Sequence, residues 1–147
     1  MQKLFLLMFS ISIAHTCFAQ SAKDSADIRA AALNYVEGWY EGNAERMARA
    51  VHPKLAKRIV DWNDDVTKNE NVLSEMNGER LVENTKKAYG KSTPKERQIK
   101  NITILSINNN TASVKAEMSD WYDFMHIGRW NGEWKIINVL WEMKPQQ

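Results

Sequence analysis

The sequence predicts an α+β fold in which helices come first along the chain and antiparallel strands come last. Between residues 28 and 39, apolar side chains recur at helical spacing. Near the other end, Asn131-Gly132 separates two runs rich in aromatic and β-branched residues, which is the pattern of a β-hairpin with a type I′ turn. Helices gathered before strands indicate a helical layer that covers one face of a sheet.

The first 19 residues have the three-part pattern of a secretory signal peptide. Lys3 precedes an uncharged, mostly apolar run from Leu4 to Ala14, and Cys17-Phe18-Ala19 supplies the small residues of a cleavage site before Gln20. A membrane-spanning helix needs about 20 apolar residues, so this shorter run predicts export and release with no membrane span. The alternative is a lipid anchor on Cys17, although the residues before it match a lipoprotein signal poorly. We therefore expect a periplasmic or extracellular protein.

The remaining residues, 20–147, are predicted to form a single domain, because their number suits one hydrophobic core. Cleavage removes the single cysteine of the chain, so the domain must be stabilised by burial alone. Without Lys3, the 20 Lys and Arg residues become 19, against 18 Asp and Glu. This near-neutral charge argues against nucleic acid as the partner.

The first helix is predicted to begin at Ser25, a favourable N-cap residue, and to end at Gly42. Its apolar residues fall at the i, i+3, i+4 and i+7 spacing that places them on one face. These residues are Ile28, Ala31, Ala32, Tyr35, Val36 and Trp39.

Asn43 is predicted to cap a second helix that carries Met47, Ala50 and Val51, and Pro53 marks a turn after it. Residues 58–62 are predicted as a short strand, followed by a polar loop through residue 71. A third helix is expected to begin at residue 78 or 79 and to end at residue 88, because Gly90 follows shortly after.

Four strands complete the predicted chain as an antiparallel meander. The first two cover residues 98–107 and 111–118, and three asparagines between them suit a turn because asparagine tolerates left-handed geometry. A break near Ser119-Asp120 leads into the final hairpin. There, a two-residue loop pairs Trp130 with Glu133 and fixes which side chains share a face. That face is predicted to hold Asp123, Met125, Ile127, Arg129, Trp134, Ile136, Asn138 and Leu140.

Asp123 is unusual on this face, because most of its predicted neighbours are apolar. A carboxylate among aliphatic side chains needs a partner or a raised pKa. Asn138, diagonally across the hairpin, would lie within side-chain reach. The arrangement is typical of a binding pocket with a polar anchor. The alternative is a structural role, in which Asp123 bonds Asn138 or the Tyr35 hydroxyl and fixes the packing.

Several of these segments together resemble the family named Putative lumazine-binding. They are the first helix with Tyr35, the Gly42-Asn43 break, Ala50-Val51-His52-Pro53, and Asp123-Phe124-Met125-His126 leading to Trp134-Lys135-Ile136-Ile137-Asn138. The family is a branch of the nuclear transport factor 2-like (NTF2-like) superfamily, which includes ketosteroid isomerases, dehydratases and polyketide cyclases. The resemblance implies a strongly curved antiparallel sheet wrapped around three helices, forming a cone with an internal pocket.

The resemblance also implies roles for particular residues. In enzymes of this superfamily, an Asp or His in the pocket acts as the base, opposite a Tyr or Asp that holds an oxyanion. Asp123 and His126 are therefore the candidate catalytic bases, and Tyr35 or Tyr40 is the candidate hydroxyl donor. His126 also has a simpler interpretation as a half-buried structural histidine.

No metal or cofactor is expected. His52 and His126, the two histidines beyond the signal segment, lie on different elements, and no cysteine accompanies them, which argues against zinc. A Gly-rich phosphate loop, a G-x-S-x-G elbow and an H-E-x-x-H motif are also absent from the sequence.

The favoured hypothesis is an exported protein that binds a small apolar or planar ligand in an internal pocket. The alternatives are a cofactor-free isomerase, dehydratase or cyclase, and a non-catalytic homodimeric accessory module with Trp121 and Trp130 on its partner surface. For the favoured hypothesis, the predicted ligand-binding residues are Tyr35, Trp39, Asp123, Met125, Trp134, Asn138 and Leu140.

Overall fold

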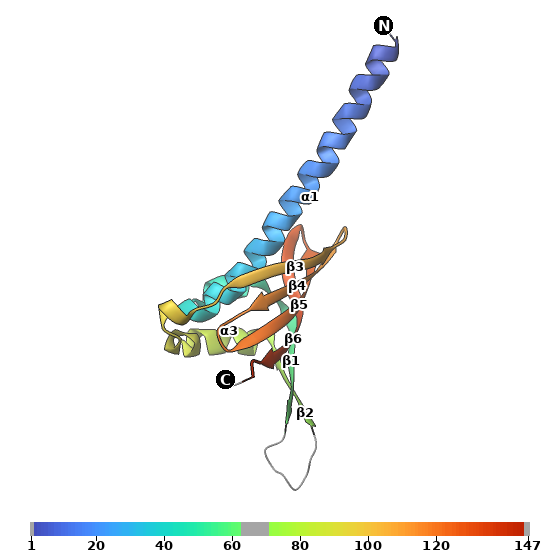
Figure 1. Ribbon diagram of the computed structural model, residues 1–147. Helices are drawn as coiled ribbons and strands as arrows, with labels where there is room; N and C mark the ends of the chain where they lie inside the picture. The colour runs from blue at the N-terminus through green and yellow to red at the C-terminus, as the bar shows by residue number, and fades with distance from the viewer. Residues whose placement is uncertain (1, 63–70, 146–147) are drawn as a thin grey trace.

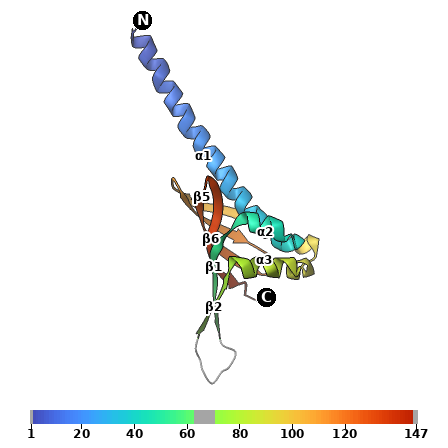
Figure 2. The same cartoon turned by 180° about the vertical axis from the view of Figure 1, so that it is seen from behind.

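The computed structural model describes residues 2–62 and 71–145, and within them it shows three α-helices and a curved, open sheet of six strands. The helices pack against the sheet, and the N-terminal part of α1 projects beyond it as a rod (Figure 1). Seen from behind, α2 and α3 lie on the same side of the sheet (Figure 2). The predicted α+β class is confirmed. The elements are α1 (Gln2–Glu41), α2 (Ala44–Ala50), β1 (Val51–Trp62), β2 (Asn71–Asn77), α3 (Gly78–Lys86), the 3₁₀-helices η1 (Tyr89–Ser92) and η2 (Lys95–Arg97), β3 (Asn101–Ile107), β4 (Thr111–Glu117), β5 (Trp121–Trp130) and β6 (Glu133–Met143).

The strands lie in the order β2-β1-β6-β5-β4-β3. The predicted antiparallel meander from β3 to β6 is confirmed. The predicted short strand is instead the long β1, which pairs in parallel with β6 and antiparallel with β2. Strand β2 was not predicted. It begins at residue 71, where the polar loop was expected to end, and the rest of that loop lies outside the described residues.

Helix α1 is one continuous helix, so its predicted start at Ser25 is wrong. No glycine or proline precedes Gly38 in the sequence, and nothing therefore interrupts the helix at Ser25. The predicted apolar face is confirmed, because Ile28, Tyr35 and the other members of the stripe up to Val36 are buried. The helix also runs across the predicted cleavage point, and the signal peptide stays a prediction.

Asn43 caps α2 as predicted, since its side-chain oxygen accepts a hydrogen bond of 2.9 Å from the backbone N–H of Arg46. The placement of Val51 in that helix and of Pro53 in a turn is wrong, because both lie in β1. The pairing of β1 with β6 is irregular between Val51 and Ala56. Pro53, which has no N–H to donate, is tolerated where this ladder is interrupted.

The final hairpin starts in the predicted register, with Trp130 opposite Glu133 and Ile127 opposite Ile136. The next pair, however, is His126 with Asn138, so Ile137 is an extra residue on β6. Such a β-bulge bends its strand and reverses which residues beyond it face inward. The register predicted beyond Ile136 is therefore wrong.

The bulge changes the inner face of β6. Val139 is buried and Trp141 is half-buried, whereas Leu140 is 53% exposed. On β5 the alternation continues unbroken, and Asp123 and Met125 are buried as predicted. The core of the domain lies between this inner face and the helices.

Candidate functional site: an aromatic pocket around Lys57

A cavity of about 160 Å³ opens between helices α1 and α3 and the inner face of the sheet. Its walls are mostly apolar and aromatic, and Lys57 and Asn84 supply polar side chains, which is the usual composition of a small-molecule site. We call this cavity the inner pocket. It is lined by Tyr35, Trp39, Lys57, Met76, Leu81, Asn84, Trp121, Trp141 and Met143.

Three tryptophans form one wall of the inner pocket. Trp121 lies edge-to-face with both Trp39 and Trp141, at ring-centroid distances of 6.1 Å in each case. Edge-to-face packing is the favoured arrangement of aromatic rings and fixes their orientation. All three rings are only partly buried, so they present a preformed aromatic surface to the cavity.

A buried polar cluster lies beside this wall and consists of Tyr35, Lys57, Trp121 and Asp123. The Lys57 ammonium forms an ion pair with Oδ1 of Asp123 and donates a hydrogen bond of 2.8 Å to the Tyr35 hydroxyl. The Trp121 indole N–H donates a hydrogen bond of 3.0 Å to Oδ2 of Asp123. Both carboxylate oxygens are thus engaged, and Asp123 is fully buried.

The sheet topology brings Lys57 and Asp123 together. Lys57 on β1 is registered with Val139 on β6, and Asp123 on β5 is registered with Trp141 on β6. The two charged residues therefore lie two strands apart, roughly 10 Å across the sheet, and the long lysine side chain spans that gap. Its nitrogen lies 4.7 Å from the centroid of the Trp141 ring, a cation–π distance.

Burial shifts the proton affinities in the cluster. Removal from water lowers the pKa of Lys57 below its ordinary value, although the negative charge of Asp123 opposes this change. Burial raises the pKa of the Tyr35 phenol well above its ordinary value, and the charge of Asp123 raises it further. Tyr35 therefore remains a neutral hydroxyl across the physiological pH range.

The structure places some of the predicted ligand-binding residues at the inner pocket and others elsewhere. Tyr35 and Trp39 line the cavity, and Asp123 lies behind it in the polar cluster. Met125 is buried in the core and is not among the lining residues. Trp134 is buried away from the cavity, where the Arg129 guanidinium lies 4.7 Å from its ring centroid.

Asn138 and Leu140 were predicted to face the pocket, and this placement is wrong. The bulge at Ile137 turns both side chains to the opposite face of the sheet, where they are exposed. The predicted contact of Asp123 with Asn138 is accordingly replaced by its contacts with Lys57 and Trp121.

His126, the other candidate base, also lies on the opposite face, where it pairs with Asn138 across the strands. A groove of about 360 Å³ runs beside it. No predicted pocket aromatic contributes to that groove. Its lining is Ser106, Asn108, Thr111, Ala112, Ser113, His126, Ile127, Gly128, Ile137 and Asn138.

Lys57 is the residue of the candidate site that the sequence interpretation missed. A signal for it exists, because Leu55, Lys57 and Ile59 alternate along the strand and the two apolar neighbours are buried. An alternating pattern with one charge on its apolar side predicts an inward-facing charge. The alternative of a homodimeric accessory module would place Trp121 on the partner surface, whereas the structure places it in the wall of the inner pocket.

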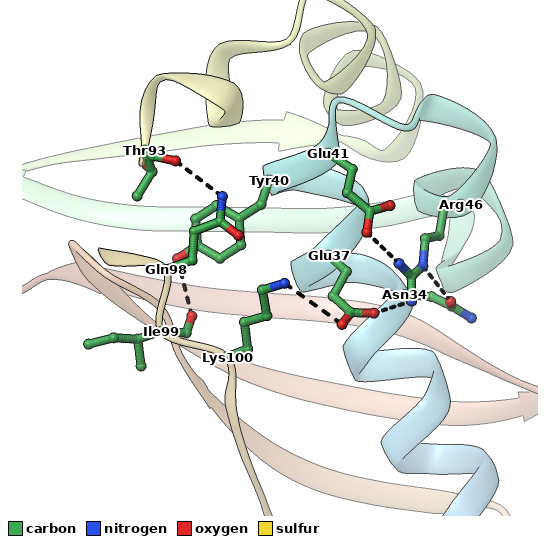
Figure 3. A network of polar contacts seen from close by, with 9 residues as sticks. All are labelled: Asn34, Glu37, Tyr40, Glu41, Arg46, Thr93, Gln98, Ile99 and Lys100. Carbon is green, nitrogen blue, oxygen red and sulfur yellow. Dashed lines mark hydrogen bonds and ion pairs between the residues drawn. The ribbon is translucent and has the colours of Figure 1, made fainter. Parts of the chain in front are cut away.

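A separate network anchors the end of α1 that carries the pocket residues (Figure 3). Arg46 on α2 forms ion pairs with Glu37 and Glu41 of α1, the latter at 2.9 Å. The ammonium nitrogen of Lys100, just before β3, lies 3.8 Å from Oε1 of Glu37. The Tyr40 hydroxyl donates a hydrogen bond to the backbone carbonyl of Ile99. Tyr40 therefore has a structural role and does not line the inner pocket.

Two further features are absent from the described part of the chain. No group of three His, Cys, Asp or Glu side chains that could hold a metal ion is found there. Within the same residues, no helix combines the length and hydropathy needed to cross a membrane.

Residues 23–142 match the sequence model of the family described as "Putative lumazine-binding". The chain belongs to this family. The matched segment includes the whole polar cluster and all residues lining the inner pocket except Met143. The family predicted from the resemblance is therefore confirmed. A comparison with curated proteins found no match.

Solved structures confirm the fold expected for the family. The chain is similar to an NTF2-like protein of unknown function from Silicibacter pomeroyi, with 15% identity, a TM-score of 0.63 and coverage of 84% of this chain and 98% of that chain. It is also similar to an NTF2-like protein of unknown function from Shewanella baltica, with 16% identity and a TM-score of 0.63. That match covers 85% of this chain and 97% of the other. A third similar structure is an NTF2-like protein with a cystatin-like fold from Novosphingobium aromaticivorans, with 9% identity and a TM-score of 0.63. That match covers 90% of this chain and 89% of the other.

Proposed function

We propose that this protein binds a small, planar molecule in the inner pocket, with the aromatic wall against the face or edge of the ligand and Lys57 as its hydrogen-bond donor. The observation that carries the proposal is Lys57, a charged residue that lines an aromatic cavity while its side chain is almost fully buried. A lysine nitrogen has three protons. Asp123 and Tyr35 accept two of them, and the third is available to an acceptor atom in the cavity.

The size of the inner pocket limits the ligand. A cavity of about 150 Å³ in another protein accommodates benzene. The inner pocket, at about 160 Å³, suits a molecule of one ring or a compact pair of rings. Lumazine, after which the family is named, is a planar bicyclic compound with carbonyl acceptors and thus belongs to this class.

The energetics of the cluster also favour a binding role. A buried ion pair gives little net stability, because the desolvation of both charges offsets their attraction. Apolar residues of similar volume at positions 57 and 123 would stabilise the fold about as well. The donor that faces the cavity is the property such residues would lack.

Ligand titration tests the proposal, with the intrinsic tryptophan fluorescence as the signal and lumazine and benzamide as probes. Replacing Lys57 by Met removes one charge-assisted hydrogen bond, of about 1.5–3 kcal/mol, and should raise Kd by about ten- to a hundredfold. Lys54→Met is the matched control, since Lys54 is an exposed lysine on the same strand. Equal Kd values for the two variants would refute the role of Lys57.

A native mass spectrum of the protein, purified gently from cells that express it, would search for the natural ligand. An adduct of small mass that disappears in the Lys57→Met variant and persists in Lys54→Met is the expected result. The same spectrum reports whether the protein is a monomer or a dimer. A clean spectrum, together with no binding of either probe, would refute the proposed function.

We also propose that the protein is exported and that residues 1–19 are removed. The support is the charge, apolar run and small residues of that segment. N-terminal sequencing of the protein from the cell envelope or medium should begin at Gln20. Recovery of the intact N-terminus from the cytoplasm would refute this part of the proposal.

A further inference from the structure

The position of the Lys57 amine has a chemical consequence beyond hydrogen bonding. Lys57 lines the cavity, and its nitrogen lies over the Trp141 ring, in contact with the Asp123 carboxylate and 2.8 Å from the Tyr35 hydroxyl. An amine, a carboxylate that can exchange a proton with it and a hydroxyl that can relay protons are the groups needed for reversible imine formation.

We propose that Lys57 forms a reversible imine with a small aldehyde or ketone bound in the inner pocket. This inference rests on the proposed function, because it requires that the pocket admit a small planar molecule. It narrows the ligand class to compounds whose carbonyl carbon can react with an amine.

The proton transfers balance within the cluster. The Lys57 ammonium first gives a proton to Asp123, and the free amine attacks the carbonyl carbon, so that a C–N bond forms as the C=O π bond breaks. Tyr35 donates its hydroxyl proton to the resulting alkoxide and takes one from the nitrogen, which gives a neutral carbinolamine. Asp123 returns its proton to the carbinolamine hydroxyl, which leaves as water. The products are a protonated imine on Lys57, ionised Asp123 and one water molecule.

The surroundings of Lys57 support this chemistry. The polar and aromatic side chains that contact it or share the pocket with it include Tyr35 of α1, Asn84 of α3, Asp123 of β5 and Trp141 of β6, and among these four Asp123 alone has a carboxyl group. Burial lowers the pKa of the Lys57 amine, which increases the share of the nucleophilic form. The raised pKa of Tyr35 keeps its phenol protonated for the relay.

Exposed lysines provide an internal comparison. An ordinary lysine with a pKa near 10.4 has roughly one neutral amine in 2,500 at pH 7, and each unit by which the pKa is lowered increases that fraction about tenfold. Lys54, which is exposed on the same strand, is the comparison residue. Because burial lowers the pKa of Lys57, this residue should react faster than Lys54.

The test is reductive trapping of the full chain with benzaldehyde and cyanoborohydride at pH 7, followed by peptide mass mapping over time. The expected result is selective addition of one reduced benzyl group at Lys57. Benzamide, which has the same shape but does not form imines, should slow trapping at Lys57 and leave trapping at Lys54 unchanged. Lys57→Arg keeps the positive charge and should remove the selective product, while Lys54→Met should retain it.

The outcomes separate this inference from the proposed function. If benzamide binds and Lys57 reacts no faster than Lys54, the imine proposal is overturned and ligand binding stands. If neither benzamide nor lumazine binds and trapping is unselective, both are overturned. The unmodified protein with benzamide competition gives the result even where Lys57→Arg does not fold.

Discussion

The buried ion pair of Lys57 and Asp123 makes the stability of the protein sensitive to one charge. Asp123→Asn removes the negative charge and replaces one carboxylate oxygen by an NH2 group of nearly the same size and position. The amide can still accept a hydrogen bond from Lys57. The substitution therefore removes the ion pair inside the fold, where Asp123 has no exposed surface, and with it the acceptor of the Trp121 indole N–H.

The expected loss is large and depends on pH. Breaking a buried pair costs about 3–5 kcal/mol. The cost has an upper limit, because Lys57 can lose its proton instead: at pH 7 this costs about 4.6 kcal/mol, from roughly 3.4 pH units at about 1.36 kcal/mol each. We therefore expect Asp123→Asn to lower the free energy of unfolding by about 3–4.6 kcal/mol at pH 7.

The sign of the pH dependence follows from proton binding. In the variant, Asp123 no longer opposes the lowering of the Lys57 pKa by burial, so Lys57 loses its proton more readily in the folded state than in the unfolded state. The unfolded state has an ordinary lysine with a pKa of about 10.4 and therefore binds more protons than the folded state as pH rises toward that value. The free energy of unfolding of the variant should therefore rise with pH, by up to about 1.4 kcal/mol per unit in this range.

Urea unfolding at pH 7, 8 and 9, followed by circular dichroism, measures both effects. Asp120→Asn is the matched control, because Asp120 is exposed and its replacement should change the free energy of unfolding by less than about 0.5 kcal/mol. The difference between Asp123→Asn and the unmodified protein should shrink as pH rises. A loss below about 1 kcal/mol that is independent of pH would show that the pair is solvated and would refute the argument.

Four further substitutions test other parts of the structure by thermal or urea unfolding. Tyr35→Phe should reduce the loss of stability above about pH 10, because the raised pKa of Tyr35 makes the folded state retain a proton that the unfolded state releases there. Gly90→Ala should destabilise by about 1–3 kcal/mol or more, since the new Cβ would lie 2.3 Å from the carbonyl oxygen of Trp39. Leu140→Ala should lower the free energy of unfolding by less than about 1 kcal/mol, because Leu140 is exposed, whereas Ile136→Ala should lower it by about 2–5 kcal/mol, because Ile136 is buried. A larger loss for Leu140→Ala than for Ile136→Ala would contradict the bulge.

Local patterns were sufficient for the elements whose contacts are local. The stripe that includes Tyr35 has a helical period whatever the rest of the chain does, and Asn131-Gly132 suits the hairpin turn, where both residues have positive φ. Asn43 likewise caps its helix through a bond to a residue three positions away. These signals predicted the α+β class, α2, α3 and the meander.

Such local patterns could not predict the bulge in β6. An alternation of period two assumes unbroken pairing, and one unpaired residue at position 137 reverses every inward and outward assignment after it. Asn138 and Leu140 were placed in the pocket for this reason. The sequence of β6 is apolar at Ile136, Ile137, Val139 and Leu140 alike, so neither register was excluded by composition.

The candidate site depends on both features that local patterns could not supply. The parallel pairing of β1 with β6 joins segments about 80 residues apart and carries Lys57 to within reach of Asp123. The bulge then turns Trp141 inward beside the Lys57 nitrogen.

In an unbroken register, Leu140 would face inward opposite Asp123, and Trp141 would point to the outer face. The lysine would then lie against an aliphatic side chain without the cation–π contact, and the aromatic wall would lose one of its three rings. The single extra residue at position 137 therefore determines the chemistry of the pocket, although its own side chain does not line it.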